Sequence, residues 1–182
     1  MLKKSSLVLI LFLASTSFIF SQVKKLQAIK NESFITYKLT HPLHEIESTS
    51  KDAYCVTDVD EKTKQVKAVA VQVDVTSFDS GNSNRDSHAM EVVEAISYPD
   101  AQFISSSVTQ KGDSLQIWGK LTFHGVTKDI YLHAFSNWSN NQLIVTGGFD
   151  ISLTEFHIQR PTLLLIPVND DLKFTFKQVF NL

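Results

Sequence analysis

The stretch VQVDVTSFDS, residues 71–80, alternates apolar and polar side chains and then runs into the polar link GNSNRDSHAMEVVEAISYPDAQF, residues 81–103. Val71, Val73 and Val75 recur at every second position, which is the period of a β-strand with one buried face. This strand must therefore lie against a core. The link that follows breaks the alternation and predicts a change of structure.

The link predicts a short helix from about Asn84 to Ile96. Ser83, followed three residues later by Asp86, resembles a helix start with an acidic side chain near the positive end of the helix. Four apolar residues are spaced by three or four and so share one face: Ala89, Val92, Val93 and Ile96. Pro99 stops the helix before a second strand around Phe103. A helix is therefore inserted between two strands.

The rest of the chain contains further alternating segments separated by turn-forming clusters. Eight candidate strands result: Phe34–His41, Glu45–Asp58, Val66–Phe78, Ala101–Gln110, Ser114–His124, Thr127–Trp138, Gln142–Thr154 and Asp171–Phe180. The short connections between them imply antiparallel neighbours. Eight such strands with one dry face either close into a barrel or fold into a sandwich, and the alternation alone barely separates the two.

Four motifs, met in order along the chain, resemble those of a known family. They are the Asp, Ser and Gly pattern of residues 74–81, the Asn-Arg-Asp-x-His of residues 84–88, Tyr98-Pro99 followed by Phe103, and GKLTFHGVTK at residues 119–128. This order is similar to that of the YceI-like proteins, secreted bacterial barrels associated with polyisoprenoid and other lipid binding. Residues 89–95 depart from the family pattern, which indicates a variant subgroup. The resemblance implies an all-β, eight-stranded antiparallel, lipocalin-like barrel with the helix near one end.

If the alternation holds in such a barrel, nine apolar residues face inward and form a wall without charge. They are Phe103, Ile117, Leu121, Phe123, Leu143, Val145, Phe149, Phe174 and Phe176. An eight-stranded barrel can hold one small ligand, and burial of apolar surface contributes on the order of 25 cal/mol per Å² before the costs of association. The sequence therefore predicts binding, and carriage or storage, of an apolar lipid, either a polyisoprenoid or a fatty-acid-like molecule.

Two other classes of function stay open. The same inward residues would also fit a dry core, which would make the protein a periplasmic or surface interaction domain with no ligand. The apolar run Leu163–Ile166 predicts a buried edge or strand more than a docking patch. An enzyme is disfavoured because no Gly-x-Ser-x-Gly elbow is present. We therefore expect no catalytic residue and no cofactor. A continuous interior cavity would favour the carrier, and a filled interior the interaction domain.

Two groups of polar residues are candidate sites. Arg85, Asp86 and His88 belong to the family motif and are expected to organise the link between strand and helix, with contact to the polar head of a ligand as the alternative. The six histidines are scattered, and none shows a spacing typical of local metal ligands, so no metal site is expected.

The N-terminal segment and the composition of the chain predict its location and its partners. Lys3 and Lys4, an apolar run at residues 7–20 and the small Ser21 predict an export signal over residues 1–21, and hence a periplasmic or extracellular protein with one domain at residues 22–182. The net charge of -2 and a pI of about 6.3 predict no nucleic-acid partner. Transient contact with a membrane surface and a homodimer are compatible with this picture. Cys55 is the only cysteine, so any disulfide would be intermolecular.

Overall fold

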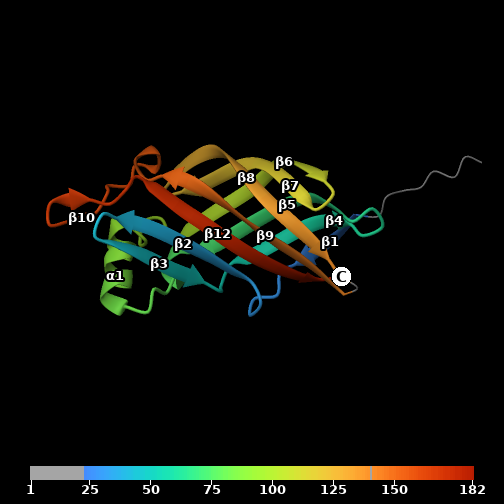
Figure 1. Cartoon of the computed structure of the whole chain (residues 1–182), viewed down its shortest axis with the longest axis horizontal. Coiled ribbons are helices and arrows are strands. Elements are labelled where there is room, and N and C mark those ends of the chain that lie inside the picture. Colours follow the sequence, from blue (N-terminus) through green and yellow to red (C-terminus); the bar gives the residue numbers. More distant parts are fainter. Residues whose placement is uncertain (1–22, 140) are drawn as a thin grey trace, which may run out of the picture.

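The computed structural model describes residues 23–139 and 141–182, and within them ten strands form one sheet that curls around an apolar interior (Figure 1). All neighbouring strands of the sheet are antiparallel. In sheet order they are β1 (Val23–Gln27), β4 (Tyr54–Asp60), β5 (Gln65–Asp74), β6 (Asp100–Lys111), β7 (Ser114–Phe123), β8 (Val126–Trp138), β9 (Gln142–Ser152), β12 (Asp171–Asn181), β2 (Phe34–His41) and β3 (His44–Ser50). The fold is all-β, as the sequence predicts.

The predicted number of eight strands is wrong, for two local reasons. The segment Glu45–Asp58, expected to be one strand, is split into β3 and β4 by residues 51–53, which leave the sheet. The other addition is β1, where only Leu26 is buried, so its sequence shows no alternation. A strand of five residues with one buried side chain gives no periodic signal.

The curl of the sheet brings together strands that are not neighbours in its order. An isolated bridge joins Ala28, just after β1, to Phe180 of β12, and Ile29 donates its backbone N–H to the carbonyl of Val179 at 2.7 Å. A second bridge joins Thr49 of β3 to Asp79, in the link before the helix. These contacts hold the sheet in the shape of a half-barrel, with one face turned inward.

Strand β7 shows how the sequence pattern becomes an inside and an outside. Leu115, Ile117 and Leu121 are buried, while Trp118 and Lys120 between them are exposed. Because successive side chains of a strand point to opposite faces, this alternation places one face of β7 in the core. The prediction that this strand has one buried face and one solvent-exposed face is confirmed.

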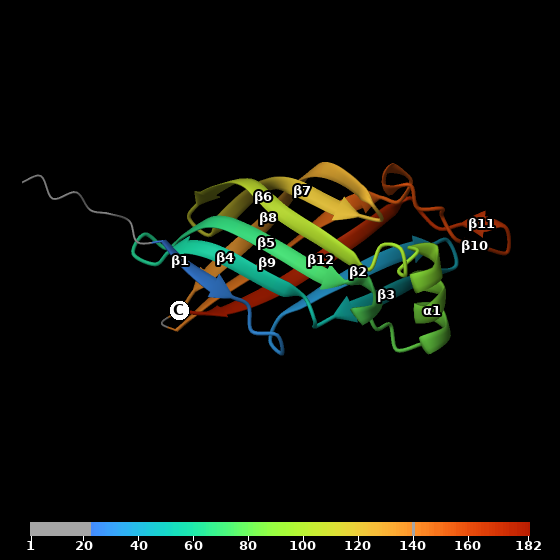
Figure 2. The same ribbon diagram turned by 180° about the vertical axis from the view of Figure 1, so that it is seen from behind.

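The helix between β5 and β6 is shorter than predicted. Strand β5 ends at Asp74, the 3-10 helix η1 (Val75–Ser77) follows, and α1 spans Ser83–Val92. Asn82 caps α1, since its side chain accepts a hydrogen bond from the backbone N–H of Arg85 at 3.1 Å. Ile96, predicted to share the buried face of the helix, lies beyond its end and is fully exposed. Helix α1 lies across one end of the sheet (Figure 2).

Two shorter elements follow β9 at the same end as α1. They are the 3-10 helix η2 (Thr154–Phe156) and a hairpin of β10 (Thr162–Leu163) and β11 (Ile166–Pro167) that projects beyond the sheet (Figures 1 and 2). The helices in the described residues are all too short or too polar to cross a membrane. The predicted export signal, residues 1–21, lies outside the described residues.

Gly119 offers a test of the packing inside the curl. A Cβ atom at this buried position of β7 would collide with the ring of Phe103 and would lie 2.5 Å from the carbonyl oxygen of Ile104. We expect Gly119→Ala to lower the free energy of unfolding by about 1–3 kcal/mol, because neither ring nor backbone can move without disturbing β6. Urea denaturation measures the change.

Lys120→Ala is the matched control, because Lys120 is the neighbouring residue of β7 and its side chain points outward. Its unfolding free energy should stay within about 0.5 kcal/mol of the parent protein. Equal stability of Gly119→Ala and the parent would show that Phe103 does not lie against β7.

Candidate functional site

An internal cavity of about 250 Å³ lies within the curl of the sheet. Every strand of the ten-stranded sheet except β1 contributes to its wall, and so do η1 and α1. The lining is almost wholly apolar, with valine, leucine, isoleucine and phenylalanine side chains dominating. An engineered apolar cavity of about 150 Å³ in another protein stays dry and takes up benzene. A larger cavity with such a wall is suited to an apolar guest.

Eight of the nine residues predicted to face inward line this cavity. They are Phe103, Ile117, Leu121, Phe123, Val145, Phe149, Phe174 and Phe176. The ninth, Leu143, is fully buried but is not part of the wall. It pairs with Phe180 of β12, which is also buried but belongs to the wall. The alternation thus places side chains on the correct face but does not tell where that face surrounds a cavity.

Aromatic rings form a connected row along one side of the cavity. The rings of Phe149 and Phe174 are stacked with centroids 4.9 Å apart, Phe174 contacts Tyr37 at 6.4 Å, and Tyr37 contacts Phe78 at 5.3 Å. Burial raises the pKa of Tyr37, and the negative charge of Asp86 adds to this effect. The Tyr37 hydroxyl therefore stays neutral across the physiological pH range, and the row carries no charge.

Sequence reasoning missed the contribution of β2, β4 and α1 to the wall. Tyr37 and Leu39 come from β2, Cys55 and Thr57 from β4, and Met90 from α1. In β2 the lining residues Ile35, Tyr37 and Leu39 alternate with polar residues, so the period-2 pattern was a signal that could have found them. In β4 Cys55 is of a type that is usually buried, but Thr57 is of a type found mostly on surfaces and Val56 between them is apolar, so the pattern does not mark the inward face.

Few polar atoms lie on the inner wall. Thr57 donates its hydroxyl to the carbonyl of Ala68 at 2.8 Å and is satisfied within its own sheet. Gln178 is only 4% exposed; its amide nitrogen donates to the carbonyl of Phe34 at 3.4 Å, and its side-chain oxygen has no hydrogen-bond partner. Burial raises the pKa of the Cys55 thiol to about 12. Away from α1 the wall thus carries no charged side chain, and Gln178 has one unsatisfied acceptor.

The three motif residues Arg85, Asp86 and His88 also border the cavity, at the end covered by α1. Arg85 donates to the hydroxyl and the carbonyl of Ser80, at 2.9 and 2.8 Å, and the Asp86 carboxylate accepts the backbone N–H of Ser80 at 3.2 Å. The side chain of His88 is 65% exposed and lies 3.6 Å from Glu91. Since the cavity reaches an exposed side chain here, its opening to solvent lies beside α1.

The hairpin of β10 and β11 differs most from the sequence prediction. The run Leu163–Ile166 was expected to be a buried edge or strand, but its four side chains are 45%, 76%, 95% and 41% exposed, in chain order. Leu164 and Leu165 form the two-residue turn, with φ of 52° and 68°. A left-handed conformation costs roughly 1–2 kcal/mol for a residue with a side chain, and turns of this kind favour Asn-Gly. Neither the backbone strain at this turn nor the exposure of its apolar side chains stabilises the folded chain.

A comparison with family models and one with curated proteins agree on one family. The model of the YceI-like domain family matches residues 26–180. The chain is 33% identical to Protein YceI of Salmonella newport and 34% identical to Protein YceI of Escherichia coli O17:K52:H18, in each case over 105 residues. These matches cover 56% of this chain and 55% of the relative, so the chain spans about half the length of the curated relatives it matches.

Solved structures share the fold. BcnA of Burkholderia cenocepacia superposes with a TM-score of 0.75 at 20% identity, over 84% of this chain and 98% of its own. The YceI protein of Campylobacter jejuni gives 0.67 at 23% identity, over 75% and 85%. A polyisoprenoid binding domain from Saccharophagus degradans, implicated in plant cell wall breakdown, gives 0.64 at 11% identity, over 88% and 99%.

Cys55 reports on whether the wall is closed to water. With a pKa of about 12 in the native protein against an ordinary value of 9.0, we expect a thiol reagent at pH 8 to label the native protein on the order of a thousandfold more slowly than the urea-unfolded protein. Because the native state holds this proton more tightly, the thiol contributes stability below pH 9 that is lost as the pH rises toward 12.

Stopped-flow labelling of the parent, with Cys55→Ser as the blank, measures the two rates. Native labelling within about tenfold of the unfolded rate would place Cys55 in contact with solvent and contradict its burial.

Proposed function

We propose that this chain, which belongs to the YceI-like domain family, binds the apolar part of a lipid inside its curled sheet and carries or stores that lipid. The observation that supports this proposal is the cavity of about 250 Å³ with its apolar wall. A polyisoprenoid or a fatty-acid-like chain is the ligand class that fits such a wall. The proposal needs neither a catalytic group nor a cofactor.

The binding free energy comes from the apolar surface area buried in the cavity and not from directional polar contacts. Each apolar Å² removed from water contributes about 25 cal/mol, and the branched and aromatic side chains of the wall offer close contact along a hydrocarbon chain. The Saccharophagus degradans neighbour is named for polyisoprenoid binding, which favours an isoprenoid over a straight chain. Apolar contact alone discriminates weakly between chains that differ by one methylene.

We further propose that the two isolated bridges close the sheet into a lipocalin-like barrel around the ligand. In this arrangement the tail lies among the aromatic row, and the polar head of the lipid lies beside α1, where Arg85, Asp86 and His88 border the cavity. Export to the periplasm or the cell exterior, predicted from residues 1–21, would place the protein where lipids move between membranes.

The competing interpretation is an interaction domain whose interior is filled by its own side chains. The cavity weighs against it, because protein interiors are close-packed and a void of this size leaves its lining without contacts. The direct test is organic extraction of protein purified without detergent, followed by mass spectrometry. Repeated absence of any lipid, together with no uptake of a fluorescent apolar probe, would refute the carrier proposal.

Blocking the cavity should abolish this uptake without unfolding the protein. Ala101 lies on the wall, opposite Val73 of β5, and Ala101→Phe places a ring in the cavity. We expect the affinity for a fluorescent fatty-acid probe to fall by at least about tenfold, equivalent to ~1.4 kcal/mol, because the ring occupies the space of the guest. Fluorescence titration measures the affinity.

Ala70→Phe is the matched control. Ala70 lies on β5 outside the wall and pairs with Ile104, so the same chemical change is made on the outer face. It should leave probe affinity unchanged. Equal affinity in both variants would mean that the probe binds elsewhere.

A further inference from the structure

The exposed end of the β10–β11 hairpin consists of Leu163, Leu164, Leu165 and Ile166, and we call these four residues the apolar tip. The tip is the outermost part of a segment, residues 161–168, that contains no charged side chain. Leu164 and Leu165 occupy the two turn positions in a left-handed conformation that glycine and asparagine adopt far more readily. Leucines kept at strained and exposed positions indicate that their side chains contact something outside the chain.

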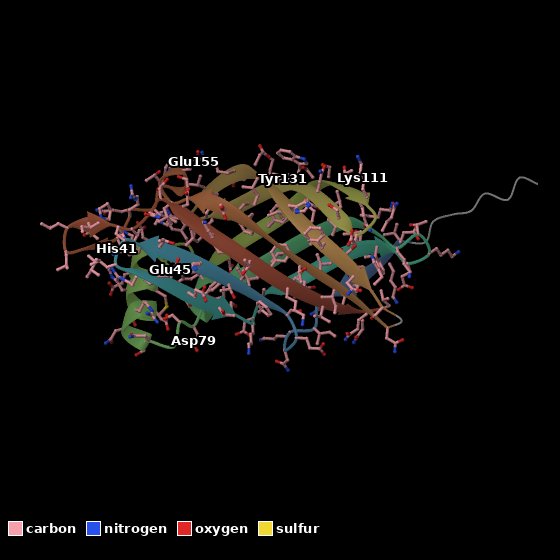
Figure 3. All side chains as sticks on the ribbon, viewed as in Figure 1. His41, Glu45, Asp79, Lys111, Tyr131 and Glu155 are labelled. Atoms are coloured by element: carbon pink, nitrogen blue, oxygen red, sulfur yellow. The ribbon has the colours of Figure 1, made fainter. Side chains whose placement is uncertain are left out.

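The tip is held in place by hydrogen bonds to β2 and at its base. The backbone N–H of Leu43 donates to His41 Nδ1 at 3.2 Å, so the proton of the ring is on Nε2, which donates to the carbonyl of Ile166 at 3.0 Å. At its base, Val168 donates its N–H to the carbonyl of Pro161 at 2.9 Å, and the following Asn169 donates to the carbonyl of Thr40 in β2 at 2.8 Å. His41 lies at the end of the sheet from which the hairpin projects (Figure 3). The tip is therefore presented in one orientation.

The base of the hairpin is part of the cavity wall. Ile158, Pro161 and Val168 all line the cavity, so the tip continues directly from the site of the proposed function. Leu43, in the turn between β2 and β3, is also exposed, and this turn is joined to the hairpin through His41. Helix α1 lies at the same end (Figure 2). One end of the molecule thus combines the cavity opening with exposed apolar side chains.

The shape of the apolar tip indicates which kind of partner can contact it. A stable protein interface buries about 800 Å² on each partner and needs a broad complementary surface. The tip is a narrow projection with a two-residue apex, and residues 161–168 carry no charge that could pair with a protein partner. A lipid bilayer accepts such a projection, because its acyl boundary takes up apolar side chains without a shaped partner surface.

We propose that the apolar tip inserts into the surface of a lipid bilayer and holds the opening of the cavity against the membrane. This inference rests on the proposed function, because a membrane is then the source or the destination of the bound lipid. Since the tip carries no charge, the attachment depends on apolar contact and needs neither anionic lipid nor low salt.

The double variant Leu164→Asn, Leu165→Gly tests the proposal without endangering the fold. Asn-Gly is the favoured sequence for a two-residue turn with positive φ, so the variant removes the apolar side chains and relieves the strain at once. We expect the parent to bind phosphatidylcholine vesicles at low and at high salt, and the variant to bind at least about tenfold more weakly. Vesicle flotation measures both, and urea denaturation should show equal or higher stability for the variant.

Ile104→Asn is the control, because Ile104 is an exposed apolar residue on the outer face of β6, far in sequence from the hairpin. It should leave vesicle binding unchanged. Residues 1–22 are the same in all three proteins, so differences between them arise at the substituted positions. Equal vesicle binding of the parent and the double variant, or no binding by the parent, would overturn the proposal. A parent dimer that the double variant dissociates would overturn it too, since the tip would then contact a second copy.

Uptake of the fluorescent fatty-acid probe from solution separates this inference from the proposed function. The double variant should keep the parent's uptake, because none of the tip residues lines the cavity. Vesicle binding without any uptake would refute the carrier and leave the membrane contact in place.

Discussion

The structure depends on one constraint, which is that alternate side chains of every strand must fit inside a strongly curled sheet. Near the C-terminal end of β12 the paired Leu143 and Phe180 are buried, and Phe180 belongs to the cavity wall. Toward α1 the inward side chains pack against the inner face of the neighbouring strands. The Phe103 ring covers Gly119, and the Phe176 ring approaches within 2.8 Å of where Gly147 would carry a Cβ. Rings packed onto glycine backbones leave the centre open, and the cavity follows from this packing.

The link between β5 and α1 determines how the open part of the interior ends. Ser50 and Ser77 are joined at 2.6 Å, Thr49 pairs with Asp79, and Arg85 and Asp86 both bind Ser80. These bonds fix α1 across the end of the sheet, so that its Ala89 and Val92 complete the apolar wall while His88 faces solvent. A boundary between apolar wall and polar rim is the arrangement that an amphipathic lipid requires.

Much of this fold could be predicted from the sequence, since alternation and the four motifs depend on local residues. The family is confirmed by the match over residues 26–180. Three features could not be predicted. β1 has a single buried residue, the split between β3 and β4 occurs without glycine or proline, and the end of α1 at Val92 precedes an apolar residue, Ile96, that remains in solvent. The cavity itself depends on the curvature of the whole sheet, which no local pattern encodes.

The apolar wall of the cavity has an energetic consequence. Apolar surface that stays in contact with water does not contribute the roughly 25 cal/mol per Å² that its burial would give. A guest that buries this wall stabilises the fold by RT ln(1 + c/Kd), where c is its free concentration, so the gain rises with the logarithm of its concentration and affinity. If the chain binds lipid as proposed, the protein without its lipid is the less stable form. Contact with a membrane, as proposed for the apolar tip, would then keep the lifetime of that form short.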